Sequence, residues 1–589
     1  MISAVAPASA PRVPVSATRE RIDPGLALAL AMGLIAAVPV IAATVHGLLD
    51  GWLPAGDQAN IATRAHDVFT SRSSLVGLHS DASAAINHDV YSLGPMLFWL
   101  LAVPARLSSP GWMTLTMGLV NVASIVGAVV LAQRRGGRLL MFMSAAALAL
   151  MSRSLAPEVL HDVWNPSAGL FPFTLLIFLC WSLACGEYRL LPLTVLVASF
   201  VVQCQLAFVP PSLGLIAVAL AGLVLSLRGS HRQARGDGTR RDGRVWPWAL
   251  AAVVVAIACW SAPAIDEIQG HPGNLTWVVR AATANTSKLG ATVGAHTVVR
   301  AVGIPPWWLR DPASPWDRKY EVRARSSTLA TITTVLMLLA LLAYLAIGAL
   351  RRRTELWTGA AIALVLCAGL FAVAEATPTK RVLAETLGYT LWWGSPAGMF
   401  VWLIVGWGAV ALLRELAAKR RRPRLAIRVP ALAATVAGAA VVAVVAAGVA
   451  AGARADYHKP EYGPLATMYA GLRQGVPAGR TVRLLGFLGS NTFRFKQAAR
   501  FAMLRRGIRP LSPGIDVRLG TWYDLDHRTY DCTVYVEDGA RRPQRGAVRV
   551  ARMRFDDGTG GHPLSVWVAP AGCPRGGRKG AVASSSARP

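Results

Sequence analysis

The chain has 589 residues, of which 54 % are hydrophobic and only 15 % are charged. Soluble domains carry about 25 % charged residues, so this composition excludes an ordinary soluble protein and predicts a polytopic α-helical membrane protein. The 60 Lys and Arg exceed the 31 Asp and Glu, which gives a net charge of +29. These basic residues stand in short runs between apolar stretches, where they contact anionic lipid and set topology, so nucleic acid is not an expected partner.

Apolar stretches follow one another from residue 25 to residue 452, after a Pro/Ala-rich segment, 1–24, that is predicted to be disordered and cytoplasmic. The segment 93–105 has only about 13 residues, short of the roughly 20 that a spanning helix needs, and is predicted to be interfacial or re-entrant. Leaving it out gives eleven predicted spans: 25–48, 112–133, 138–153, 168–185, 190–208, 211–227, 246–264, 329–350, 355–375, 392–414 and 427–452.

Basic residues fall on one side of this arrangement. They occur in the N-terminal segment and after every second predicted span, at 134–138, 189, 228–244, 351–353 and 419–422. The positive-inside rule makes that side cytoplasmic. The outward loops are then 49–111, 154–167, 265–328 and 376–391, and the region after 452 is also outside.

The C-terminal region 453–573 mixes helix and strand patterns and is predicted to form a small extracytoplasmic α/β domain. It begins with a Pro/Tyr-rich linker, YHKPEYGP. Helices are expected at 466–476 and 490–507, and strands at 481–489, 533–538, 548–555 and 564–570. Cys532 and Cys573 are expected to form a disulfide if this region is extracytoplasmic. The Gly/Ser/Arg-rich tail 574–589 is predicted to be disordered.

The first outward loop, 49–111, is the polar segment on which a functional interpretation depends. Asp57 follows the first span, and the stretch 58–69 has the spacing of an amphipathic helix at the membrane surface. A carboxylate there can act as general base on an acceptor hydroxyl of a substrate at the interface. The alternative is that Asp57 only caps this helix.

Three His-Asp-Val triplets lie in the predicted outward loops, and each offers a histidine beside a carboxylate. They are His66-Asp67, His88-Asp89 and His161-Asp162, each followed by Val. Such groups can bind a divalent cation, which is the possible cofactor, or can form a polar network that organises the loops. The second alternative is favoured, since adjacent side chains often point apart.

The segment HDVYSLGPMLFW at 88–99 leads from a polar motif into an aromatic interfacial helix. An acidic motif after the first span followed by such a segment resembles the C-type (GT-C) glycosyltransferase superfamily, whose members often have HPPLYY there. This chain lacks that Pro-Pro pair. The resemblance covers about residues 25–170 and implies a polyprenyl-phosphate sugar donor on the outer face and a catalytic aspartate that maps onto Asp57. The overall plan is similar to actinobacterial cell-wall arabinofuranosyl- and mannosyltransferases.

Substrate contacts are expected from the second and fourth outward loops as well. Trp164 offers an aromatic surface for a sugar ring and Asn165 a hydrogen-bonding group, although Trp164 can also be an interfacial belt residue. Arg64, on the face of Asp57, and Lys380 and Arg381 are candidate cations for a phosphate leaving group. For each cation the alternative is a solvated or lipid-facing side chain.

The sequence thus predicts transfer of a sugar from a polyprenyl-phosphate donor to an extracytoplasmic acceptor, which is a cell-wall glycan, a lipid or a protein. Asp57 would deprotonate the acceptor in one inverting step, and the cations would stabilise the departing phosphate. The alternatives are a transporter or lipid flippase of the cell envelope, which would carry ionisable residues buried mid-span, and a non-catalytic scaffold that binds wall polymer.

Overall fold

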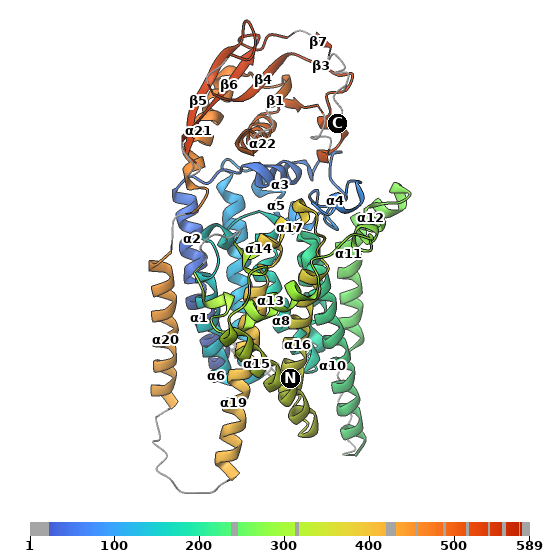
Figure 1. Ribbon diagram of the computed structural model, residues 1–589, viewed down its shortest axis with the longest axis vertical. Helices are drawn as coiled ribbons and strands as arrows, with labels where there is room; N and C mark the ends of the chain where they lie inside the picture. The colour runs from blue at the N-terminus through green and yellow to red at the C-terminus, as the bar shows by residue number, and fades with distance from the viewer. Residues whose placement is uncertain are drawn as a thin grey trace, which may run out of the picture.

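The structure is a computed structural model in which a bundle of membrane-length helices carries a small α/β domain at one end (Figure 1). It describes residues 23–236, 245–311, 317–419, 431–453, 456–486, 490–513, 518–539, 542–556, 561–575 and 578–579. The predicted N-terminal segment up to residue 22, and most of the predicted C-terminal tail, lie outside these residues.

All eleven predicted spans are helical where the structure describes them. The helices are α1 (Pro24–Ala36), α2 (Val38–Leu49), α6 (Gly111–Arg153), α8 (Leu170–Ala184), α9 (Leu191–Cys204), α10 (Val209–Gly236), α11 (Trp246–Gly270), α15 (Thr328–Leu350), α16 (Thr354–Glu375), α19 (Gly394–Lys419) and α20 (Ala431–Ala451). Within the described ranges, eight helices are long and apolar enough to cross a membrane, and the α1–α2 pair, bent by 47°, makes a ninth. The chain is therefore a multi-pass membrane protein.

Two features account for the difference between eight or nine helices and eleven predicted spans. Helix α6 contains two of the predicted spans, and it is broken at Gly136 and Gly137, where Gly137 has a φ of 66° that favours glycine. Helix α9 is shorter than the helices that meet this length. The segment 93–105 contains only the short helices α5 (Met96–Leu101) and η1 (Pro104–Arg106), so the prediction that it does not span is confirmed.

The loops at the end of the bundle nearest the α/β domain are themselves largely helical. Their α-helices are α3 (Gly56–Asp67), α4 (Ser83–Ile86), α7 (Asn165–Ala168), α12 (Asn274–Ala282), α13 (Ala291–Val302), α14 (Arg318–Glu321), α17 (Arg381–Glu385) and α18 (Leu387–Thr390). Short 3-10 helices are η2 (Pro157–Leu160), η4 (Leu206–Phe208) and η5 (Trp307–Leu309), and η3 (Tyr188–Leu190) precedes α9.

The C-terminal domain is a five-stranded mixed sheet with two helices between it and the bundle (Figure 1). Its elements are α21 (Lys459–Gly475), β1 (Thr481–Gly486), α22 (Ser490–Leu504), β2 (Arg509–Leu511), η7 (Thr521–Tyr523), β3 (Thr529–Tyr530), β4 (Cys532–Asp538), β5 (Val548–Asp556), β6 (Gly561–Ala569) and β7 (Arg578–Lys579). The strand order is β2-β1-β4-β6-β5; β1 pairs in parallel with β2 and β4, and β6 pairs antiparallel with β4 and β5. The predicted helices and the four predicted strands are confirmed.

Two expectations for the C-terminal region are corrected. The predicted linker YHKPEYGP is mostly the first part of α21, which contains Pro460 and Pro464. Proline is tolerated in the first turn of a helix, and the second proline removes one hydrogen bond only, so the helix continues. Part of the predicted disordered tail forms β7, which pairs with β3.

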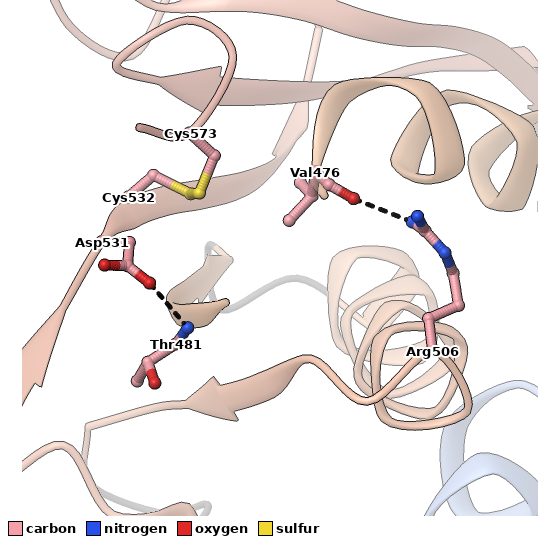
Figure 2. The surroundings of a disulfide bond; sticks show 6 residues. All are labelled: Val476, Thr481, Arg506, Asp531, Cys532 and Cys573. Carbon is pink, nitrogen blue, oxygen red and sulfur yellow. Dashed lines mark hydrogen bonds between the residues drawn. A yellow bond between two sulfur atoms is a disulfide. The ribbon is translucent and has the colours of Figure 1, made fainter. Parts of the chain in front are cut away.

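A disulfide joins Cys532, at the start of β4, to Cys573, after β6, as predicted (Figure 2). Beside it, the Asp531 carboxylate accepts a hydrogen bond from the backbone N–H of Thr481 at 3.0 Å, which fixes the start of β1 against β4. Arg506, after α22, donates to the Val476 carbonyl at 3.0 Å and ties α22 to the end of α21. These links fix the strands and helices of the domain against one another.

Helix α3 is amphipathic, as its sequence predicts, but it is covered on two sides instead of lying on a membrane surface. Ile61, Ala62 and Ala65 belong to one core cluster with Met113 and Met117 of α6 and with side chains of α22. Figure 1 shows α3 lying across the top of the bundle, beneath α22. The C-terminal domain, and not lipid, supplies the apolar surface against which this face of α3 packs.

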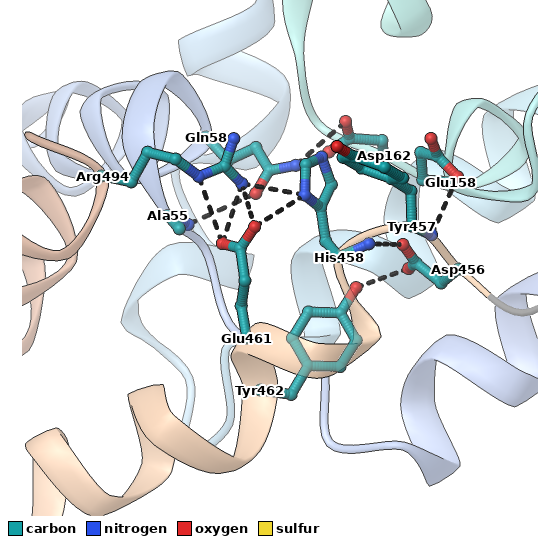
Figure 3. A network of polar contacts seen from close by, with 10 residues as sticks. All are labelled: Ala55, Gln58, Glu158, Asp162, Asp456, Tyr457, His458, Glu461, Tyr462 and Arg494. Atoms are coloured by element: carbon teal, nitrogen blue, oxygen red, sulfur yellow. Dashed lines mark hydrogen bonds and ion pairs between the residues drawn. The ribbon is translucent and has the colours of Figure 1, made fainter. Parts of the chain in front are cut away.

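A buried set of charged groups joins the start of α21 to the bundle, and we name Glu158, Asp456, His458, Glu461 and Arg494 the docking network (Figure 3). Arg494 of α22 donates to Glu461 at 2.7 Å, and His458 lies 3.0 Å from the same carboxylate. Glu158 accepts from the backbone N–H of residue 457 at 3.4 Å. Because charges removed from water need partners, this network holds the domain at one position on the bundle.

Replacing Glu158 by Gln is expected to stabilise the protein at alkaline pH. Burial, aided by the neighbouring Asp456 carboxylate, raises the pKa of Glu158 from its usual 4.5 to about 7. A raised carboxyl pKa makes the folded state bind more protons than the unfolded state, so its stability falls as pH rises from 4.5 to 7. The loss in free energy of unfolding reaches about 3 kcal/mol above pH 7.

The midpoint of thermal unfolding, measured in detergent, should therefore be higher for Glu158→Gln than for the wild type at pH 8 and the same for both near pH 4.5. The exposed Asp538→Asn serves as the control. A lower midpoint for Glu158→Gln at pH 8 would contradict the assignment.

Candidate active site

A polar cavity of about 320 Å³ lies where α3, the loops of the bundle and the C-terminal domain meet. Its lining comes from parts of the chain that are far apart in sequence. The lining residues are Asp57, Asn60, Arg64, Gly77, Leu78, His79, Ser80, Asp81, Trp164, Asn165, Pro166, Gln205, Tyr389, Phe493, Gln497, Arg518 and Leu519. Of the predicted site residues, the structure brings Asp57, Arg64, Trp164 and Asn165 together here.

Helix α3 presents Asp57, Asn60 and Arg64 to the cavity because the three stand at helical spacing, three and seven residues apart, on one face. The helix begins after Ala55, whose backbone N–H donates a hydrogen bond to the Gln58 side-chain oxygen at 3.3 Å. Asp57 is thus not the residue that caps the helix, and its carboxylate is left to face the cavity.

Protein surrounds the Asp57 carboxyl group, although its side chain is open to water inside the cavity. Burial is the largest influence on its pKa and raises it, and the Asp81 carboxylate raises it further. The indole N–H of Trp164, which donates to Asp57 Oδ2 at 3.3 Å, lowers it, as do the positive charge of Arg494 and a hydrogen bond from Asn60. The net effect is a raised pKa, which makes Asp57 a stronger base than an exposed aspartate.

Aromatic side chains at the end of the fourth outward loop and just after it hold Trp164 in place. Its ring lies 5.0 Å from that of Tyr389 and 5.6 Å from that of Trp392, measured between centroids. The Tyr389 hydroxyl donates to Asp81 Oδ2 at 2.9 Å. Asp81, Tyr389, Trp164 and Asp57 therefore form a continuous chain of contacts along the wall.

Arg64 is a largely buried cation that no carboxylate contacts directly among the described residues; Asp67 attracts its charge only at longer range. Its side chain lines the cavity and the residue is only 9 % exposed, yet it makes no ion pair and no hydrogen bond within the described ranges. The nearby Asp67 carboxylate is held instead by Arg72 at 2.9 Å and by the Tyr523 hydroxyl at 2.6 Å. Burial lowers the pKa of Arg64. An unpaired buried charge is costly, so this side chain is suited to an anion in the cavity.

The three His-Asp pairs lie in three different environments, apart from one another. Asp67 belongs to the contact with Arg72 just described, and His66 lies outside the cavity lining, with its pKa lowered to about 4 by burial. His161 is buried 3.7 Å from Asp456, and Asp162 accepts from the Gln58 side chain at 3.1 Å. Both are behind the cavity wall, at the docking network.

The third pair, His88 and Asp89, lines a second polar hollow next to the cavity. Lys380 and Arg381 line neither: Lys380 donates to the carbonyl of Ala84 at 2.7 Å, and Arg381 pairs with Glu385 at the surface. The cation expected from the fourth outward loop is therefore not at the cavity.

Asn165 lines the cavity, but its amide N–H₂ donates to the carbonyl of Cys204 at 2.9 Å and also contacts Gln205. It fixes the end of α9 against α7. Among the described residues, no group of three or more His, Cys, Asp and Glu is placed to hold a metal ion.

Sequence analysis missed Asp81, Tyr389 and Arg518. Asp81 stands in a short loop without a motif, and Tyr389 stands before a span where aromatic belt residues are common. Arg518 comes from the C-terminal domain and reaches both the cavity and Asp89, at 3.3 Å. No local signal in the sequence marks these residues, because contacts between segments far apart in the chain bring them together.

An apolar groove of about 670 Å³ runs along α5, α6, α8 and α9 beside the cavity. Trp99, Leu131, Leu175 and Phe200 are among its lining residues. Phe200 lies in the groove and Gln205 lies in the cavity, and five residues correspond to about 7 Å of helix. The two openings therefore adjoin at the end of α9.

No protein-family model matches the sequence, and no curated protein matches it either. Among the solved structures that match it are two of ArnT from Cupriavidus metallidurans, both at 14 % identity and covering 90 % of this chain and 97 % of ArnT. The structure with bound undecaprenyl phosphate aligns with a TM-score of 0.51, and the apo structure with 0.45. The chain thus has an ArnT-like fold.

Proposed function

We propose that the protein is a membrane glycosyltransferase that moves a sugar from a polyprenyl-phosphate donor to an acceptor hydroxyl. The observation that carries this proposal is the pair of Asp57 and Arg64 on one face of α3. One is a carboxylate of raised pKa and the other a buried cation without a partner among the described residues. Seven residues separate them, about 10 Å along a helix, which leaves room for a sugar between base and phosphate.

In the proposed mechanism the acceptor oxygen attacks the anomeric carbon while Asp57 takes the hydroxyl proton. The bond between the anomeric carbon and the phosphate oxygen breaks, and its electron pair leaves with the polyprenyl phosphate. Arg64 stabilises the negative charge that develops there, in a site where few waters compete for it. Trp164 positions the carboxylate and gives the sugar ring an aromatic face. One such displacement inverts the anomeric configuration.

The donor lipid fits the apolar groove beside the cavity. Its lining is suited to a prenyl chain, whose head would then reach the cavity at Gln205. The ArnT structure of similar fold holds undecaprenyl phosphate, a lipid of this class. We also propose, from the basic runs between the spans, that the N-terminus is cytoplasmic and that the cavity and the C-terminal domain face outward. The acceptor then belongs to the cell envelope.

Replacing Asp57 by Asn is expected to reduce kcat by about 10²–10⁴-fold, because the amide cannot accept the acceptor proton. Transfer from a labelled polyprenyl-phosphate sugar by membranes of each variant measures this, and Asp538→Asn is the exposed control. Binding of the donor should persist in Asp57→Asn. Equal transfer by Asp57→Asn and wild type would remove the assigned base.

Replacing Arg64 by Gln should weaken the binding of undecaprenyl phosphate by about 10–100-fold, the loss of a charge-assisted hydrogen bond. Without ligand, the same variant should unfold at an equal or higher temperature, because an unpaired buried charge has been removed. Arg473→Gln, on the exposed side of α21, removes the same charge elsewhere. Unchanged affinity in Arg64→Gln would show that the phosphate binds at another place.

Replacing Trp164 by Phe keeps an aromatic ring but removes the N–H that lowers the pKa of Asp57. The pKa of Asp57 should rise further, so a larger share of the base is protonated at any acidic pH. The acidic limb of the kcat/KM profile should therefore move to higher pH. The exposed Trp112→Phe is the control. A limb that stays in place, or moves to lower pH, would count against Asp57 as the titrating base.

A further inference from the structure

A second polar hollow, of about 650 Å³, lies between α4, α17 and the C-terminal domain. We name it the side hollow. It shares His79, Asp81 and Arg518 with the cavity that contains Asp57, so those three side chains form the partition between the two spaces. Its volume is within the range of about 300–1,000 Å³ that is typical of small-molecule sites. A molecule in the side hollow is thus separated only by these side chains from the cavity that contains the proposed base.

The partition consists of side chains already held in position. The Asp89 carboxylate lies 3.1 Å from His79 Nε2 and 3.3 Å from Arg518 Nε, and Asp81 accepts from Tyr389 at 2.9 Å. The Ser83 hydroxyl lies 2.9 Å from the His79 ring nitrogen. Each member is bonded to another, so the wall has a defined shape before a ligand arrives.

The chemistry of the lining selects against lipid and against anions. Only Ala84 and Val382 contribute apolar side chains, and the carboxylates of Asp81 and Asp89 outnumber the single guanidinium of Arg518. A lipid acceptor would leave these polar groups unpaired, and a phosphorylated one would face excess negative charge. Hydroxyl groups satisfy both hydrogen-bond donors and acceptors, and the lining offers both kinds.

The exposed His88 ring adds a flat surface that Trp277 holds in place. The His88 ring stacks on Trp277 of α12, with centroids 3.6 Å apart and planes 13° apart, and Arg280 covers the same indole at 4.6 Å. Flat rings beside polar groups are suited to the faces and hydroxyls of sugars.

We infer that the side hollow is the acceptor site and that it takes a neutral carbohydrate chain, whose terminal hydroxyl passes the partition to reach Asp57. The inference rests on the proposed function and specifies its acceptor. The donor's phosphate is held by Arg64, and the acceptor is held by Asp81, Asp89 and Arg518. Two separate entrances, the apolar groove for the donor lipid and the side hollow for the acceptor, let both substrates reach the base together.

A thiol placed in the side hollow tests this directly. Val382 is 55 % exposed and lines the side hollow, while Glu385, one turn later on α17, is exposed and does not. The seven native cysteines form one disulfide or are at least partly buried, so Val382→Cys adds the one freely exposed thiol in the described part of the chain. Its rate of maleimide labelling is measured with neutral gluco-, manno- and arabino-oligosaccharides, with a phosphorylated oligosaccharide, and with phosphatidylinositol in nanodiscs.

We expect a neutral oligosaccharide to slow labelling of Val382→Cys by about tenfold at roughly ten times its Kd, and to leave Glu385→Cys unaffected. Protection by phosphatidylinositol or by the phosphorylated sugar alone overturns the inference, and so does protection by none of the probes. Repeating the experiment with Asp57→Asn separates the two proposals, since labelling needs no turnover: protection without any loss of transfer in Asp57→Asn would reject the base and keep the acceptor site.

In the transfer assay, Val382→Trp should raise the acceptor KM about tenfold and leave the affinity for undecaprenyl phosphate unchanged. The reason is that the indole takes up space in the side hollow but not in the cavity or the groove. Glu385→Trp is the matched control on the same helix. An unchanged acceptor KM in Val382→Trp would place the acceptor elsewhere.

Discussion

The packing of α3 between two bodies is the constraint on which the site depends. A twelve-residue helix of this polarity would be marginal alone in water, and its stability comes from tertiary contacts. Ile61, Ala62 and Ala65 give it those contacts with the bundle and with α22. Once these faces are occupied, the row of Asp57, Asn60 and Arg64 has only the cavity to face. The same packing that stabilises the helix thus orients its charged side chains.

The charges on that row are held in a state that favours substrate. Burial raises the pKa of Asp57 and the Trp164 hydrogen bond limits the rise, so the carboxylate is a stronger base than an exposed aspartate. Arg64 keeps its positive charge in a largely buried position without a direct ion-pair partner among the described residues. Such a charge lowers the stability of the empty protein, and an anion that binds there recovers the loss. The protein is therefore more stable when an anion occupies the site.

Hydropathy and helical spacing predicted the spans, the short helix α5, the exposed face of α3 and most of the C-terminal strands, because each of these depends on local sequence. The site was predicted only where it is local too, at Asp57, Arg64, Trp164 and Asn165. Arg518 and Tyr389 join it through contacts between distant segments, which no spacing reveals. Lys380 and Arg381 are basic residues in a loop that is predicted to face outward, but the Ala84 carbonyl and Glu385 satisfy them. The His-Asp pairs recur in sequence and end in three different environments.

The C-terminal domain is part of the cavity and not an appendage to it. It supplies Phe493, Gln497, Arg518 and Leu519 to the lining, and Arg518 also forms the partition to the side hollow. Its position is set by the docking network, and beside that network Asp162 accepts a hydrogen bond from Gln58, the residue next to Asp57. A shift of the domain would therefore move the base and the partition together. This explains why a polar, charged interface is placed there: an apolar contact would bind the domain equally well, but hydrogen bonds between charged groups fix its register.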